Sequence, residues 1–125
     1  MLNVKKLLTK VLNSIKVDYI IEQGSTGAWT YRKWKSGKVE AWAQNLDLGS
    51  QTGAVWVSPI RYKDLTGALP SELFPSAPIL QVTSGTNQWW VNNANATSAT
   101  AFTTRCCTLS SSAATVYLNV YAKTW

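Results

Sequence analysis

Residues 29–46 read WTYRKWKSGKVEAWAQNL, and this stretch decides the fold class. Apolar and polar residues alternate on both sides of a short segment at residues 35–37, which contains a glycine. On the second side, Val39, Ala41 and Ala43 fall on one face of an extended chain, because successive side chains of a strand point to opposite faces. Alternation of this kind around a short glycine-containing turn predicts a β-hairpin with one buried face.

The same period continues to the end of the chain. We expect strands at residues 18–23, 28–34, 38–46, 53–63, 78–84, 88–92, 99–109 and 115–125. Loops are expected at residues 49–53 and 93–96, and a longer crossing segment with two prolines at residues 66–77. About eight antiparallel strands joined by short turns predict an all-β fold. The architecture that we expect is a jelly-roll-like antiparallel β-sandwich, preceded by a short N-terminal helix.

The first seventeen residues have a different period. Val4, Leu8, Val11 and Ile15 are spaced four, three and four residues apart, with lysines outside this line. Heptad spacing predicts an amphipathic coiled-coil helix over residues 1–17, followed by a head domain over residues 18–125. A helix of this length is marginal alone in water, so it must pack on its own head or on copies of itself. The broad apolar seam favours a three-stranded coiled coil, and we therefore expect a homotrimer.

The residues that most enzymes use are scarce. The chain has no histidine and only six acids, so His-containing triads and His-bound metal sites are excluded. Cys106 and Cys107 are adjacent, and a disulfide between neighbouring strand residues would be strained. We expect Glu22 and Glu40 to form cross-strand ion pairs with nearby basic residues rather than the paired carboxylates of a glycosidase. The sequence predicts no enzyme activity, no catalytic residue, no metal and no cofactor.

The net charge of +6 is concentrated in the first sixteen residues and in a second cluster at Arg32, Lys33, Lys35 and Lys38. Such clusters are typical of solvated faces, and a footprint for a polyanion is the alternative. The basic stripe weakens towards the C-terminus, so we expect no nucleic-acid partner. No run approaches the ~20 apolar residues that span a bilayer, so we expect no membrane insertion. Binding of the basic helix to a membrane surface stays open as an alternative.

Seven tryptophans are the largest excess in the composition. Most are expected in the core or at interfaces, because large aromatic rings dominate the energetics of both. Trp89 and Trp90 differ, since adjacent strand residues face opposite sides, so that one ring can be core while the other is not. An exposed ring framed by amides is typical of saccharide binding. We therefore predict a saccharide site at Trp89, Trp90, Asn87, Asn92 and Asn93.

Three segments carry a resemblance to a known family: DYIIEQG at 18–24, WTYRKW at 29–34 and KVEAW at 38–42. They resemble the C-terminal head or knob domains of tail-fibre, receptor-binding and related structural proteins of bacteriophages and prophages of Gram-positive hosts. The remainder of the chain is similar only in its general pattern of short strands. The familiar proteins carry long N-terminal stalks, and this chain departs from them in having a short helix.

The resemblance implies a viral structural protein, made in the cytoplasm of the bacterial host and carried on the virion. It implies a trimeric appendage whose partners are other virion proteins and a saccharide on the host surface. The alternative is a purely structural virion, assembly or head-fibre protein without a ligand.

Overall fold

The hairpin expected from residues 29–46 is formed by β2 (Trp29–Trp34) and β3 (Val39–Gln51). Val39, Ala41 and Ala43 are buried, as the alternation predicts. The turn between the strands contains Gly37, whose φ of 94° lies in the region that glycine adopts without steric cost. Strand β3 then pairs with the C-terminal strand β9 (Ala114–Lys123), and this long pairing is the centre of one sheet.

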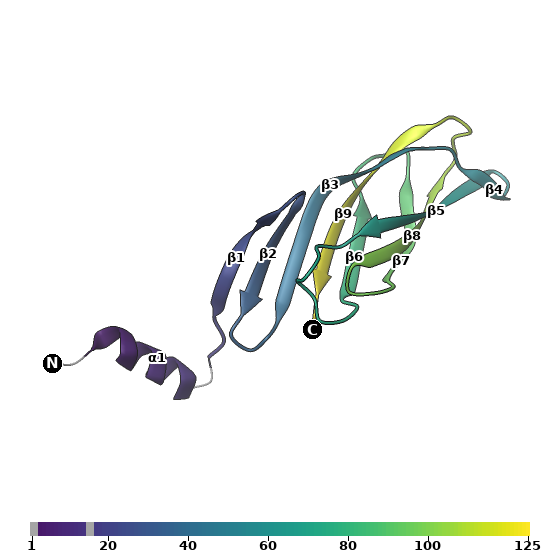
Figure 1. Ribbon diagram of the computed structural model, residues 1–125. Helices are drawn as coiled ribbons and strands as arrows, with labels where there is room; N and C mark the ends of the chain where they lie inside the picture. Colours follow the sequence, from purple (N-terminus) through teal and green to yellow (C-terminus); the bar gives the residue numbers. More distant parts are fainter. Residues whose placement is uncertain (1–2, 15–16) are drawn as a thin grey trace.

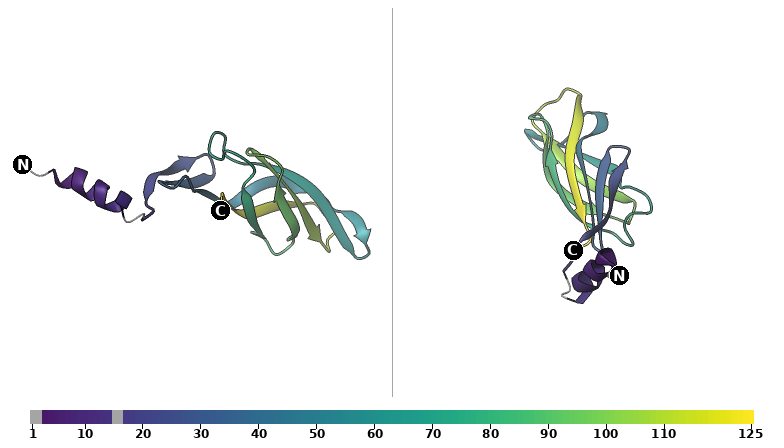
Figure 2. Two further views of the ribbon diagram at one scale, coloured as in Figure 1. Left: turned by 90° about the horizontal axis from the view of Figure 1, so that it is seen from below. Right: turned by 90° about the vertical axis from the view of Figure 1, so that its left-hand side faces the viewer.

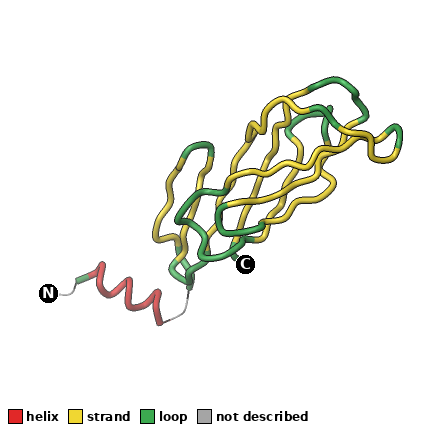
Figure 3. Tube along the Cα trace, turned by 45° about the vertical axis from the view of Figure 1, so that its right-hand side comes forward, coloured by secondary structure: helices red, strands yellow, loops and turns green. Residues whose placement is uncertain are grey.

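The computed structural model describes residues 3–14 and 17–125 and contains two antiparallel sheets within them (Figure 1). The other strands are β1 (Ile20–Thr26), β4 (Ala54–Val57), β5 (Ile60–Ala68), β6 (Ile79–Ser84), β7 (Trp90–Ala96) and β8 (Ala101–Thr108). One sheet has the order β1-β2-β3-β9-β6 and the other the order β4-β5-β8-β7. Figure 3 shows the strands running lengthwise with the loops gathered at their ends. The predicted all-β sandwich is confirmed.

The core lies between the two sheets. Inward residues of β9 are Val116, Leu118, Val120 and Ala122, all buried as expected from their spacing. The opposing sheet contributes Phe102 and Cys106 of β8, which are fully buried. Gly67 of β5 is paired with Phe102, and the ring occupies the space where a side chain at Gly67 would be. The ring and the glycine therefore fit together as one unit of the core.

Strand β3 runs through residues 49–51, where the sequence predicted a loop. Its pairing with β9 shifts register twice, after Ala43 and after Asp47. Asn45 and Gly49 have φ values of 52° and 83° at these two places. The N–H of Gly49 donates to the Asp47 carboxylate at 2.7 Å, which satisfies a backbone group that the pairing leaves out. Each shift is a β-bulge, which bends a strand without ending it, and the loop prediction was therefore wrong.

Other boundaries also differ from the prediction, among them the end of β1 at Thr26 and the end of β5 at Ala68. The single strand expected at 53–63 is the hairpin of β4 and β5, which turns at the cis Ser58–Pro59 bond. Proline has a fixed φ and no N–H, so it interrupts the ladder at this point. The turn expected at 93–96 is the second half of β7. This strand is an edge, where asparagines are tolerated because one side of the backbone faces water.

Helix α1 (Val4–Ser14) confirms the helix prediction for these eleven residues. Asn3 precedes it as an N-cap, since its side-chain oxygen accepts the N–H of Lys6 at 3.1 Å. The helix extends away from the sandwich, and the β4 hairpin lies at the opposite end of the molecule (Figures 1 and 2). Val4, Leu8 and Val11 of the predicted seam are exposed, and Ile15 lies outside the described residues. No helix in the described ranges is both long and apolar enough to cross a bilayer.

Candidate functional site

The outer face of the four-stranded sheet carries an aromatic surface. Trp90 of β7 and Tyr62 of β5 are both paired with Cys107 of the intervening strand β8, so the three side chains share one face. The ring of Trp56 in β4 packs edge-on against Tyr62, with a centroid separation of 5.8 Å and an interplanar angle of 70°. Trp56 and Trp90 are 44% and 41% exposed, large fractions for indole rings.

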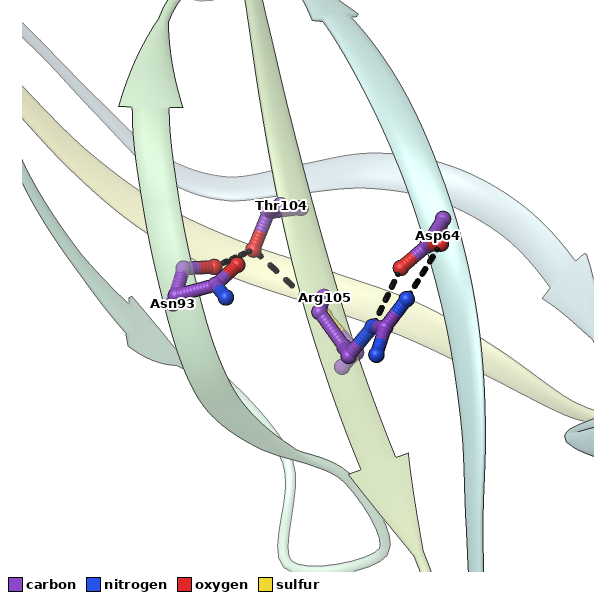
Figure 4. A network of polar contacts seen from close by, with 5 residues as sticks. Asp64, Asn93, Thr104 and Arg105 are labelled. Atoms are coloured by element: carbon purple, nitrogen blue, oxygen red, sulfur yellow. Dashed lines mark hydrogen bonds and ion pairs between the residues drawn. The ribbon is translucent and has the colours of Figure 1, made fainter. Parts of the chain in front are cut away.

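Arg105 occupies the next outward position of β8 and joins this surface. Its guanidinium lies 4.3 Å from the ring centroid of Tyr62 and 5.0 Å from that of Trp56. It also donates two hydrogen bonds to the Asp64 carboxylate, at 2.7 and 2.8 Å (Figure 4). We call the surface made by Trp56, Tyr62, Trp90 and Arg105 the aromatic platform. The bidentate pair with Asp64 holds the Arg105 guanidinium in place against the rings of Tyr62 and Trp56.

The electrostatics of the platform follow from that pair. Hydrogen bonds from Arg105 lower the pKa of the Asp64 carboxyl, and the same hydrogen bonds raise the pKa of Arg105. Both groups are therefore charged at neutral pH, and their charges cancel locally. An uncharged saccharide is better suited to such a surface than an ion is.

The two cysteines lie on opposite sides of β8. Cys107 is in the outward row between Trp90 and Tyr62, and Cys106 faces the core. Both are free thiols and both are buried. Burial raises the pKa of each thiol, so neither is activated as a nucleophile.

The structure places the five predicted saccharide residues in different surroundings. Trp90 is on the platform, and Asn93 is paired with Arg105 at its edge, where its carbonyl accepts the Thr104 hydroxyl at 2.8 Å (Figure 4). Asn92 is exposed at the register shift of β7, and Asn87 is exposed in the loop before β7. Trp89 is only 2% exposed and belongs to the core. Its ring therefore cannot contact a saccharide, and this residue is removed from the predicted site.

Sequence reasoning missed three members of the platform: Trp56, Tyr62 and Arg105. They come from β4, β5 and β8, which are far from Trp90 in the chain. Only the register of the four-stranded sheet brings them together, and no local pattern in the sequence encodes that register.

The acidic residues near the first hairpin form ion pairs, as predicted. The Glu22 carboxylate lies 3.0 Å from the Lys33 ammonium, and the Glu40 carboxylate lies 3.6 Å from the Arg32 guanidinium. Glu40 also accepts the hydroxyl of Tyr121. Burial, followed by this hydrogen bond, raises the pKa of Tyr121 to about 12. Within residues 3–14 and 17–125, no group of three His, Cys, Asp or Glu side chains is placed to hold a metal ion.

Comparison with known proteins gives one structural likeness. No protein-family model and no curated protein matches the sequence. Among solved structures, an N-truncated R1-type pyocin tail fibre superimposes with a TM-score of 0.60 over 94% of this chain and 95% of that chain. This chain has the fold of a pyocin tail fibre. The sequence identity is 17%, so the likeness concerns the fold, and the host and the ligand stay predictions.

Proposed function

We propose that the protein is a tail-fibre-like structural component of a phage or prophage particle. In this proposal, three chains join through α1, and their β-sandwich heads attach the particle to a saccharide on the surface of a Gram-positive host. The tail-fibre fold over nearly the whole chain is the observation that carries the proposal. The location follows from it: the chain is made in the host cytoplasm and assembled with other virion proteins.

The exposed seam of α1 supports the trimer. The helix has eleven residues, too few to be stable alone in water. Val4 and Leu8 expose 71% and 58% of their surface, and Figure 1 shows the helix clear of the sandwich. Burial of such side chains stabilises a helix by roughly 1.5–3 kcal/mol each, and sister helices provide the matching apolar seams. The heads would then project from one end of a short three-helix stem.

The aromatic platform supports saccharide binding. Sugar rings present C–H groups that stack on indole faces, and Trp56 and Trp90 supply two such rings. The amide of Asn93 lies next to Arg105, where it can exchange hydrogen bonds with sugar hydroxyls. Because Arg105 is already held by Asp64, binding orders few side chains and loses little entropy.

Sedimentation equilibrium of the full chain tests the assembly. We expect a mass three times the 13.8 kDa of one chain. Leu8→Asp should give monomers, because three carboxylates would meet in the seam, whereas Thr9→Asp should leave the mass unchanged. A wild-type chain that sediments as a monomer would remove the trimer.

Binding of purified host cell-wall glycans, measured by a glycan array and by calorimetry, tests the attachment role. Trp90→Ala should weaken binding at least about tenfold. Trp125→Ala is the matched control, because Trp125 is also 41% exposed and lies outside the platform. Equal losses from both variants, or no glycan binding by the wild type, would leave a purely structural role in the particle.

A further inference from the structure

The five-stranded sheet carries a second surface that is separate from the platform. Its outer face holds a groove of about 340 Å³ on strands β1, β2 and β3. Polar residues and one tryptophan line it on that face: Gln23, Ser25, Thr30, Arg32 and Trp42. Gln23 is paired with Arg32, and Thr30 is paired with both Ser25 and Trp42, so the five side chains point to the same side. We propose that this groove binds an acidic saccharide, with Arg32 holding its carboxylate or phosphate group.

The guanidinium of Arg32 is held near its neighbours without a hydrogen bond from its N–H groups to any residue that the structure describes. Its guanidinium lies 5.1 Å from the ring centroid of Trp42 and 3.6 Å from the Glu40 carboxylate, a distance too long for a hydrogen bond. Among the described residues, it makes no hydrogen bond, in contrast to Arg105, which makes two. The side chain is 44% exposed. Arg32 is thus positioned by its neighbours and still has its N–H donors for an anion.

The surroundings of Arg32 favour an anion. Glu40, the acid beside it, is buried and already accepts the hydroxyl of Tyr121. Lys123 is paired with Glu40 and adds a second positive charge to this end of the face. Glu22 lies on the inner face, where it is paired with Lys33. The outer face around the groove therefore keeps a net positive charge, which an acidic ligand complements.

The remaining groups suit the sugar that carries the acid. Trp42 is partly exposed and offers an aromatic surface for stacking. Gln23, Ser25 and Thr30 present an amide and two hydroxyls, which both donate to and accept from sugar hydroxyls. A single anion such as chloride or sulfate would use Arg32 alone, whereas an acidic saccharide uses the whole groove.

Titrations of the full-length chain, followed by amide chemical shifts in NMR, test the inference. The probes are a tetrasaccharide with alternating glucuronate, a short glycerol-phosphate oligomer carrying glucose, and neutral maltotetraose. We expect saturable shifts in β1, β2 and β3 with at least one acidic probe, and at least tenfold weaker binding of maltotetraose. The acidic probe that binds identifies whether the carboxylate or the phosphate is the natural group.

Three variants decide whether Arg32 acts as proposed. Arg32→Gln should weaken binding of the acidic probe at least tenfold, and Gln23→Ala should weaken it a few-fold without affecting folding. Lys33→Gln is the matched control, because it removes one charge from the same strand but from the inner face. Arg32→Lys keeps the charge beside Glu40, and we expect it to fold normally and bind weakly, since an ammonium lacks the planar fork.

Other results would overturn the inference. An equal loss from Lys33→Gln would mean general electrostatic attraction, and unchanged binding in Arg32→Lys together with Gln23→Ala would mean that the groove is not the site. Trp90→Ala should leave this binding unchanged. Weaker binding of the acidic probe by Trp90→Ala would place the acidic saccharide on the aromatic platform. The two proposals are therefore tested separately: the groove can be ruled out while attachment through the platform is supported, and attachment through the platform can be ruled out while the groove is supported.

Discussion

Gly67→Ala tests the central packing of the sandwich. A Cβ at Gly67 would lie 2.1 Å from the ring Cζ of Phe102, whereas carbon atoms in contact prefer about 3.5–4.0 Å. The ring must therefore move by more than about 1 Å. It is fully buried, and protein cores are too closely packed to allow such a movement without cost. The φ of Gly67 is outside the left-handed region, so alanine meets no backbone strain of that kind. The destabilisation therefore comes from overlap with the ring.

The magnitude has two bounds. Overpacking of a core costs about 1–3 kcal/mol, and complete loss of a buried phenylalanine costs about 3–5 kcal/mol. We expect about 3 kcal/mol, which for a domain of this size corresponds to a fall in melting temperature of roughly 10–15 °C. The total free energy of unfolding of a domain is about 5–15 kcal/mol, so the variant should fold but be clearly weakened.

Urea unfolding followed by tryptophan fluorescence measures the effect, with Gly27→Ala as the control. Gly27 has open space around it, and its φ of 57° costs alanine about 1 kcal/mol. In a Phe102→Leu background, Gly67→Ala should cost less than in the wild type, because the overlapping ring is gone. If Gly67→Ala costs no more than Gly27→Ala, or costs the same in the Phe102→Leu background, overlap with the Phe102 ring is not the cause of the destabilisation.

Three other predictions follow from the polar contacts and the bulges. Because the pKa of Tyr121 is raised to about 12, its proton stabilises the fold below about pH 10, and this stabilisation is lost as the pH rises towards 12. In urea unfolding, the free energy of unfolding should therefore fall less between pH 9 and pH 11.5 in Tyr121→Phe than in the wild type. The pKa of Asp64 is lowered, so its contribution to the free energy of unfolding is present above about pH 4 and is lost as the pH falls through the lowered pKa. The melting temperature should therefore fall less between pH 7 and pH 2.5 in Asp64→Asn than in the wild type. Gly49→Ala should destabilise by about 1 kcal/mol in thermal melts because of its φ of 83°, and Ser50→Ala should not.

The sequence predicts well where one local pattern decides the structure. Strand β9 alternates without interruption, and its four inward residues are those expected. The opposite orientations of Trp89 and Trp90 also follow from strand geometry alone. In both places the inward residues are buried and their neighbours on the other face are at least partly exposed, so the period of two is visible in the residue types.

Prediction fails where the backbone departs from a regular ladder. Gly49 is typical of a loop, but in β3 it supplies the positive φ of a bulge, and the pairing partner that reveals this is β9. Asn93 and Asn95 are typical of turns, yet they lie in an edge strand with one hydrogen-bonded side. These residues have the same local chemistry in a loop and in a strand, and only distant partners distinguish the two.

The candidate sites depend on distant partners as well. The groove residues come from three strands that are consecutive in the chain. The basic cluster that contains Arg32 can be recognised in the sequence by its charge. Alternation along β2 predicts that Arg32 and Lys33 lie on opposite faces. That Arg105 makes two hydrogen bonds to Asp64, while Arg32 lies 3.6 Å from Glu40, depends on how neighbouring strands are placed in three dimensions. The aromatic platform is still harder to predict from the sequence, because its residues come from four strands.

The position of Cys107 gives the platform a built-in chemical reporter. Its sulfur lies in the outward row between Trp90 and Tyr62, while the sulfur of Cys106 lies on the core side. A thiol-specific reagent would reach Cys107 when the two aromatic rings separate briefly, but it would reach Cys106 only when the sheets themselves part. Occupancy of the rings by a sugar should therefore slow alkylation of the first sulfur and leave the second unaffected, and the unmodified wild-type chain can report its own binding by mass spectrometry.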